Sequence, residues 1–222
     1  MGLLVAGVTG GQSLIQSAKT RAVINEATGY KRAVNIFYAK NGRLPGDPDG
    51  TGRMGKFSEN YEDIGEYSGE TVGMFKPWEE MASEGIVEYN LDTTDYWMGK
   101  ESKYVKSVVY RFTYANAGNV SYNFDEDYEV GLKNTNIMEF DSRYLGYIPA
   151  YIAAGIEEKI DDKSLTTGNV RIDYGCFTTI PEIQDDEARI ELEWEEGDIR
   201  TYKELANAKN GICNKMIFKL DL

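Results

Sequence analysis

Apolar residues recur at spacings of three and four along the N-terminal part of the chain, which is the pattern of an amphipathic α-helix. The apolar positions of this stripe are Ile15, Ala18, Ala22, Val23, Ala27, Tyr30, Val34 and Phe37. Helix stop signals follow at Asn41-Gly42 and at the prolines Pro45 and Pro48. The pattern therefore predicts one long helix over residues 3–40. Such a helix would be about 57 Å long at a rise of 1.5 Å per residue.

The residues that precede this stripe are uncharged. Residues 2–15 read GLLVAGVTGGQSLI, which is too short for a bilayer-spanning helix of about 20 apolar residues and lacks the basic start of a signal peptide. We expect this segment to be the second half of a membrane segment whose first half lies upstream. Its glycines Gly7, Gly10 and Gly11 admit two interpretations: a close approach between helices, or a locally unwound stretch between two helical halves.

Alternation of apolar and polar residues predicts β-strands over 104–114, 188–194 and 216–222. The apolar positions are Tyr104, Val108, Tyr110, Phe112 and Tyr114, then Ala188, Ile190, Leu192 and Trp194, then Met216, Phe218, Leu220 and Leu222. We expect each to be a half-buried strand of an antiparallel sheet with one solvent-exposed face. The apolar stripe of the long helix can pack on this sheet. The result is an α+β fold with an N-terminal helix over 1–42 and a globular, strand-rich head over 43–222.

The charge balance and the absence of histidine disfavour several classes of function. The chain has 37 Asp and Glu residues against 24 Lys and Arg residues, a formal net charge of −13. A surface this acidic repels phosphate backbones, so we expect no nucleic-acid partner. Without histidine the chain lacks the usual general base, the Ser-His and Cys-His nucleophile pairs and most zinc sites. No nucleophile or phosphate-loop motif is present either, so we predict no enzyme, no catalytic residue and no cofactor.

Three acidic stretches are candidates for metal or glycosidase chemistry. Asp47 and Asp49 lie in a turn rich in glycine, and residues 125–127 form an acidic run. Calcium binds several oxygen ligands in flexible loops, but neither stretch has EF-hand spacing, and an Asx turn and solvated charges are favoured. The carboxylates of 185–196 are expected on the solvent-exposed face of a strand or in its flanking turns. A glycosidase needs two carboxyl groups in different environments, one of them desolvated, and this stretch does not offer that. We therefore predict no metal site and no paired-carboxylate site.

The two cysteines, Cys176 and Cys213, are too far apart in the sequence for a CxxC metal or redox motif. They fit one structural disulfide in an exported chain, or two unpaired thiols in a reducing compartment. A disulfide closing a loop of this length would stabilise the fold by roughly 3–4 kcal/mol in the chain-entropy model. The apolar N-terminal segment favours export, and hence the disulfide.

One segment of the chain resembles a known family. Residues 2–47, GLLVAGVTGGQSLIQSAKTRAVINEATGYKRAVNIFYAKNGRLPGD, are similar to the N-terminal region of bacterial type IV pilins and type II secretion pseudopilins. Two stretches of the head support the resemblance: 75–87, a short helix with a tryptophan, and 149–171, a helix followed by a turn. In that turn the family usually has glycine where this chain has Lys163. The resemblance favours the unwound interpretation of the N-terminal glycines.

The resemblance implies a structural subunit, a pilin, of an extracellular type IV pilus-like filament. Upstream residues would carry the prepilin peptidase cleavage site and an assembly glutamate. The partners implied are identical subunits in a helical homopolymer, the inner membrane before assembly, and the pilus or secretion assembly machinery, and the location is a filament on the bacterial cell surface. The length of the helix supports this, because it exceeds what the head can cover. The residues expected to pack in the filament core are Gly7, Gly10, Gly11, Leu14 and Ile15.

Two other functions stay open at this point. A type II secretion pseudopilin belongs to the same family and differs in forming a short periplasmic piston that moves other proteins. A membrane-tethered binding module belongs to another class. Its acidic, tyrosine-rich head would recognise a ligand, and it would stay monomeric with its N-terminal segment intact.

Overall fold

The computed structural model describes residues 2–54, 76–89, 99–106, 108–115, 135–142, 147–165, 167–177, 198–199, 201–208 and 210–220. The helices are α1 (Gly2–Asn41), α2 (Lys76–Ser83), α3 (Ala150–Ile160) and α4 (Tyr202–Asn207). The strands are β1 (Lys100–Glu101), β2 (Val108–Ala115), β3 (Thr135–Ser142), β4 (Ile148–Pro149), β5 (Val170–Phe177), β6 (Asp198–Ile199) and β7 (Ile212–Lys219). The predicted long helix is confirmed, and α1 extends the predicted 3–40 by one residue at each end.

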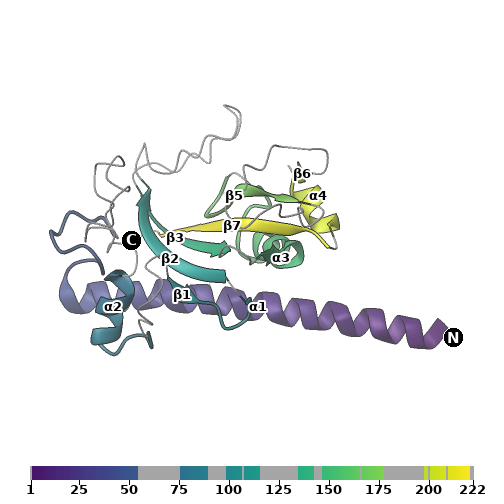
Figure 1. The fold of residues 1–222 in the computed structure, drawn as a ribbon, viewed down its shortest axis with the longest axis horizontal. Helices are drawn as coiled ribbons and strands as arrows, with labels where there is room; N and C mark the ends of the chain where they lie inside the picture. The colour runs from purple at the N-terminus through teal and green to yellow at the C-terminus, as the bar shows by residue number, and fades with distance from the viewer. Residues whose placement is uncertain are drawn as a thin grey trace, which may run out of the picture.

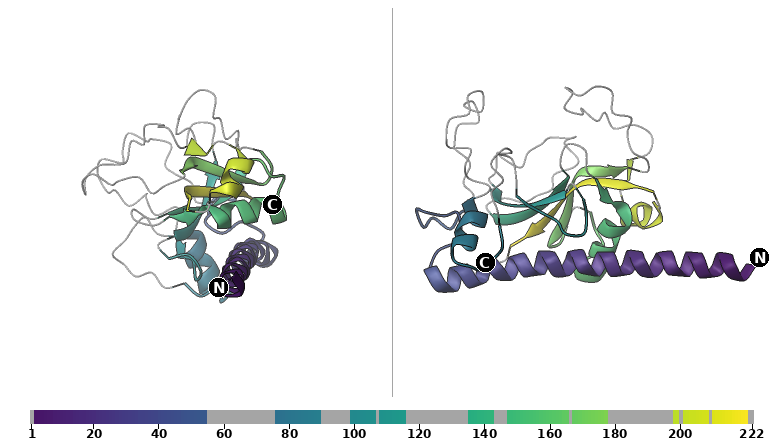
Figure 2. Two further views of the ribbon diagram at one scale, coloured as in Figure 1. Left: turned by 90° about the vertical axis from the view of Figure 1, so that its right-hand side faces the viewer. Right: turned by 60° about the horizontal axis from the view of Figure 1, so that its bottom comes forward.

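The strands form one antiparallel sheet in the order β1-β2-β3-β7-β5-β6, with β4 paired to β7 beside this path. β2 and β3 pair over their whole length, from Val108 opposite Ser142 to Ala115 opposite Thr135. Figure 1 shows α1 running along the sheet and extending well beyond it. Seen along α1 in Figure 2, the sheet and the other helices lie to one side of this helix. The predicted α+β class, with an N-terminal helix and an antiparallel sheet, is confirmed.

An aromatic cluster joins α1 to the head. The ring of Tyr30 on α1 lies 4.9 Å from that of Trp78 on α2 and 5.0 Å from that of Tyr110 on β2, centroid to centroid. The Trp78 ring also packs 4.7 Å from Phe112, and its Nε1 donates a hydrogen bond to the Tyr110 carbonyl at 3.1 Å. Tyr110 stacks on Phe140 of β3 at 4.7 Å. The inner face of α1 is therefore part of the hydrophobic core of the head.

The second face of the sheet is buried, contrary to the prediction of a solvent-exposed face for β2 and β7. Ile217 is fully buried, and Glu139 and Lys215 are nearly so. The Glu139 carboxylate lies 3.3 Å from Arg111 Nε and 3.4 Å from Lys215 Nζ, and Arg111 also pairs with Asp141. Burial raises the pKa of Glu139, but Lys215 and Arg111 outweigh it and hold the pKa below its usual value. The charged residues of this face are thus buried as compensated ion pairs.

The other predicted strands have mixed outcomes. β2 begins at Val108, so Tyr104 lies outside it and is exposed. Met216, Phe218 and Leu220 are buried, as the alternation in 216–222 predicts. Leu222 and the segment 188–194 lie outside the described residues.

The short helix predicted within 75–87 is confirmed as α2, and Gly85 ends it. Gly85 has a φ of 69°, and its N–H donates to the carbonyl of Ala82 at 2.9 Å. The next N–H, that of Ile86, donates to the carbonyl of Met81 at 2.9 Å. This pair of bonds is a Schellman motif, in which the left-handed residue is usually glycine.

The predicted disulfide is confirmed, so the alternative of two unpaired thiols is wrong. Cys176 of β5 and Cys213 of β7 are direct partners in the sheet, with their Cα atoms 4.1 Å apart. The bond closes a sequence separation of 37 residues, which is worth about 4 kcal/mol in the chain-entropy model. The disulfide links the C-terminal strand β7 to β5. Both strands belong to the C-terminal part of the head.

Candidate functional site

The two parts of α1 have different surroundings. Between residues 11 and 37, Thr20 is the first buried residue, and from there the inner face of the helix is covered as far as Phe37. We call residues 20–37 the head-packed segment. Residues 2–19 form the projecting segment, which extends past the head in Figure 1 and in the right-hand view of Figure 2. The predicted apolar stripe is thus only partly used by the head.

The head-packed segment begins where α3 crosses α1. Gly155 of α3 approaches Thr20 so closely that a Cβ at this glycine would lie 2.7 Å from Thr20 Cγ2. The Thr20 hydroxyl is turned back to the carbonyl of Gln16 at 3.0 Å. Further along, Glu26 binds the segment after β1: its Oε2 accepts from Ser102 Oγ at 2.7 Å and its Oε1 from the Lys103 N–H at 3.0 Å. These polar contacts fix the position of the head along α1.

The projecting segment holds all five residues predicted for a filament core. Leu14 and Ile15 are 74% and 70% exposed. A Cβ placed at Gly11 would meet nothing within 4 Å. Gly7 and Gly10 lie in the same stretch, and α1 is continuous through all three glycines. The interpretation of a locally unwound stretch is therefore wrong for the single chain, and Leu14 and Ile15 remain apolar side chains with no cover from their own head.

A groove of about 520 Å³ lies beside the head-packed segment. Its walls come from α1 and from the segments that follow α2 and β1. The lining residues are Ala22, Asn25, Glu26, Gly29, Tyr30, Ala33, Ile36, Ile86, Val87, Glu88, Lys100, Lys103 and Tyr104. Ile36 and Tyr104 are themselves largely exposed, so this side of the head also presents apolar side chains, beside the polar and charged ones of the groove.

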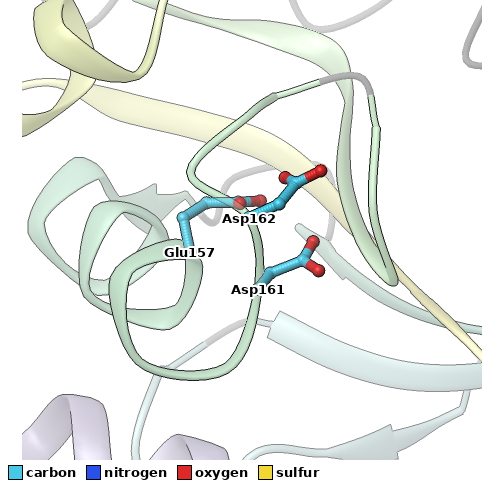
Figure 3. Close-up of side chains that lie close together, drawn as sticks. All are labelled: Glu157, Asp161 and Asp162. Carbon is cyan, nitrogen blue, oxygen red and sulfur yellow. The ribbon is translucent and has the colours of Figure 1, made fainter.

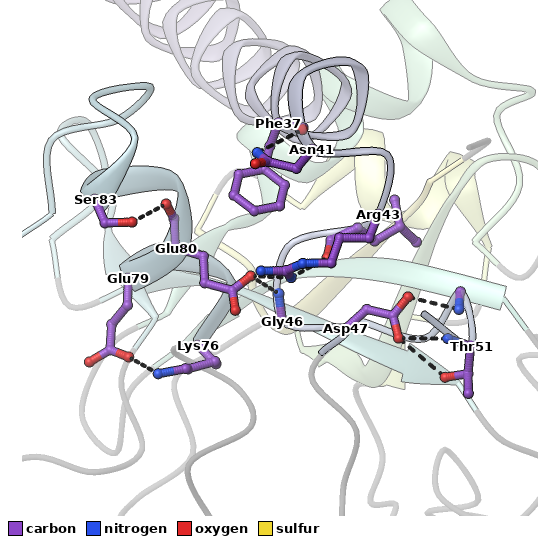
Figure 4. A network of polar contacts seen from close by, with 12 residues as sticks. Phe37, Asn41, Arg43, Gly46, Asp47, Thr51, Lys76, Glu79, Glu80 and Ser83 are labelled. Atoms are coloured by element: carbon purple, nitrogen blue, oxygen red, sulfur yellow. Dashed lines mark hydrogen bonds and ion pairs between the residues drawn. The ribbon is translucent and has the colours of Figure 1, made fainter. Parts of the chain in front are cut away.

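The acidic turn at Asp47 has the structural role that the sequence favoured. Asp47 is buried, and its Oδ1 accepts hydrogen bonds from the N–H and the hydroxyl of Thr51 at 3.0 and 3.2 Å. Its Oδ2 accepts from the Gly52 N–H at 2.8 Å. Figure 4 shows these bonds closing the turn, beside the ion pair of Arg43 and Glu80 that ties α2 to it at 2.7 Å. The acidic runs at 125–127 and 185–196 lie outside the described residues.

A different acidic cluster, which the sequence analysis did not single out, forms at the end of α3. Carboxylate oxygens of Glu157, Asp161 and Asp162 lie within 4.8 Å of one another. Figure 3 shows the three side chains together at the end of the helix. Glu157 is fully buried and, within the described part of the chain, neither of its oxygens has a hydrogen-bond partner. Burial, and then the charges of Asp161 and Asp162, raise the pKa of Glu157 to about 8. The sequence signal for this cluster was the spacing of four between Glu157, in the last turns of α3, and Asp161, the residue that caps its C-terminal end.

Comparisons with family models, curated proteins and solved structures gave no match to this chain. Among the helices that the structure describes, none combines the length and the apolar character needed to cross a bilayer.

Proposed function

We propose that this chain is a structural subunit of a type IV pilin-like filament, with no catalytic role, and that it assembles through the projecting segment of α1. The observation that carries the proposal is the exposure of Leu14 and Ile15, at 74% and 70%, on the part of the continuous helix α1 that lies beyond the head. Fully burying a leucine or isoleucine side chain is worth about 1.5–3 kcal/mol, and the head does not supply that burial.

The shape of the molecule supports one kind of assembly. A helix that projects from one end of the head, as in Figure 1, can be covered by the heads and helices of other copies, but its own surface differs from the surface that covers it. Contacts of this head-to-tail kind generate rings or open helical filaments. Ile36 on the head-packed segment is a further exposed apolar side chain of α1 that such a contact could cover.

The charge of the chain predicts how assembly responds to salt. Heads with a formal net charge of −13 repel one another, while the contact through the projecting segment is apolar. Added salt screens the repulsion between charges that are farther apart than the Debye length, which is about 10 Å at 0.1 M ionic strength. It leaves the apolar contact intact. Filament formation should therefore increase from low to moderate salt.

The proposal is tested on the purified chain by sedimentation and negative-stain microscopy, after removal of detergent. The wild type should form filaments or large oligomers, and the double variant Leu14→Gln with Ile15→Gln should stay monomeric. Ile160→Gln is the matched control, because Ile160 is an exposed apolar residue on α3 and its loss should leave assembly unchanged.

Two results would contradict this assignment. A wild-type chain that remains monomeric at high concentration and moderate salt would favour the membrane-tethered binding module instead. Assembly that survives in the double variant would show that the projecting segment is not the contact. Filament length on cells separates a pilus from a secretion pseudopilus.

A further inference from the structure

The carboxylate of Glu157 is buried without any group that neutralises or hydrogen-bonds it in the described part of the chain. It comes from the last turns of α3 and points toward Asp161 and Asp162 (Figure 3). Lys163, the next residue of the loop, does not neutralise the Glu157 carboxylate. Its Nζ lies over the ring of Tyr202 instead, 5.9 Å from the ring centroid. Buried polar atoms without partners are rare and call for an explanation, such as a bound ion.

Neither protonation state of Glu157 resolves this arrangement alone. The ionised form would be a buried negative charge beside two other carboxylates, which is costly. The protonated form, which the raised pKa favours near neutral pH, finds no acceptor at hydrogen-bond distance in the described part of the chain. The location adds to the cost, because the C-terminus of a helix carries partial negative charge and favours cations, while Glu157, Asp161 and Asp162 bring three acidic groups to the end of α3.

We infer that Glu157, Asp161 and Asp162 form a Ca²⁺-binding site at the C-terminal end of α3. All ligands offered are carboxylate oxygens, the type that hard cations select. Calcium binds oxygen at about 2.3–2.6 Å, so oxygens on opposite sides of the ion lie roughly 4.6–5.2 Å apart. The carboxylate oxygens of this cluster all lie within 4.8 Å of one another, so they can reach one such ion together. Magnesium demands near-ideal octahedral geometry and usually keeps several waters, so three protein carboxylates suit calcium better.

The remaining coordination positions are accessible. Asp162 is exposed and Asp161 half-buried, so water can reach the ion from the loop side. This site differs from the stretches at 47–49 and 125–127 that the sequence analysis weighed, and the proposal departs from the expectation of no metal site.

The ion would connect α3 to the strand that carries the disulfide. Asp161 already accepts hydrogen bonds from the N–H groups of Asn169 at 2.9 Å and Val170 at 2.7 Å, the start of β5. Asp162 accepts from the Ser164 N–H at 3.0 Å. With both aspartates held by the loop and Glu157 held by α3, a cation between them would join the two elements. The site does not depend on assembly and is testable on the monomer.

The test is calorimetric titration of the chelator-treated protein with CaCl₂, together with thermal unfolding in EDTA and in Ca²⁺. The wild type should bind one Ca²⁺ with a dissociation constant of roughly 10⁻⁶ to 10⁻³ M, and its Tm should rise with Ca²⁺. Glu157→Gln should weaken binding at least tenfold. Glu158→Gln, at the exposed neighbouring position of the same helix, should bind Ca²⁺ as the wild type does.

Asp162→Asn provides a second variant, because Asp162 is exposed and its replacement leaves the core intact. It too should weaken Ca²⁺ binding at least tenfold. Absence of any heat or Tm change up to 10 mM CaCl₂, on the order of ten times the weakest affinity expected for extracellular sites, would overturn the proposal. Equal binding by the wild type and both variants, or tighter binding of Mg²⁺ than of Ca²⁺, would overturn it as well.

Discussion

The head-packed and projecting segments of α1 share one helix and one apolar pattern, but the chain covers only one of them. Val23, Val34 and Phe37 are buried against the head, whereas Leu14 and Ile15 are exposed. The boundary lies at Thr20, where α3 meets α1. The spacing of apolar residues thus shows which face of a helix is apolar. Whether that face is covered depends on how much of the helix the folded head can reach. Variants along α1 separate the two environments.

The largest effect is expected at Phe37, near the far end of the head-packed segment. Phe37 is 2% exposed, and Phe37→Ala should lower the free energy of unfolding by about 3–5 kcal/mol, from lost burial and the cavity left behind. Urea unfolding followed by circular dichroism measures this change. The neighbouring Ile36 is 55% exposed, and Ile36→Ala should change the free energy by no more than about 0.5 kcal/mol. Similar losses for both variants would mean that the head covers α1 on both faces.

The next effect concerns the polar contact that fixes the head along α1. Glu26→Ala removes the acceptor for Ser102 Oγ and for the Lys103 N–H, and it leaves the buried Ser102 hydroxyl without that partner. Hydrogen bonds to a charged group contribute about 1.5–3 kcal/mol, so a loss in this range is expected in urea unfolding. Asn25→Ala at the exposed neighbouring position is the control. Equal effects of the two variants would contradict a specific role for Glu26.

The sequence predicted the helices and strands well, but it predicted poorly which side chains are buried and what they contact. The period of three and four located α1, and the alternation located much of β2 and β7, because side-chain periodicity is a local property. The buried pairs of Glu139 with Arg111 and Lys215 were missed, because alternating charges look solvated until the register places opposite charges together. Glu157 was missed for the same reason: its position on α3 is local, but its burial depends on contacts made by distant parts of the chain.

The turn after α3 contains one residue with an unusual backbone conformation. Lys163 has a φ of 64° and is the one non-glycine residue with positive φ among those described. The turn is therefore left-handed at this position, a conformation that lysine adopts at some cost. The exposure of Ile15, in contrast, was predicted from length, since the predicted helix was longer than the head could cover. Leu14 lies about half a turn around the helix from Val23 and so faces away from the head.

A smaller effect is expected at the boundary between the segments. Gly155→Ala places a methyl group 2.7 Å from Thr20 Cγ2, and Thr20 cannot rotate without losing its bond to the Gln16 carbonyl. The strain should exceed the gain in helix propensity, for a net loss of about 1–2 kcal/mol. Thr20→Ser removes the obstructing methyl, so in that background Gly155→Ala should be neutral or stabilising. A double-mutant cycle with no coupling would show that α3 and α1 are not in contact here.

The smallest effect is expected in the projecting segment, and it bears most directly on assembly. Ile15→Ala in dilute, monomeric protein should change the free energy of unfolding by less than about 0.5 kcal/mol, because the side chain gains little burial within its own chain. At concentrations where the wild type assembles, the same variant should lower the apparent stability of the assembled protein, because the isoleucine is then covered by another copy. Urea unfolding over a range of protein concentrations separates the two. A loss of several kcal/mol at high dilution would mean that the head folds back over this segment, which would remove the reason for one copy to cover another.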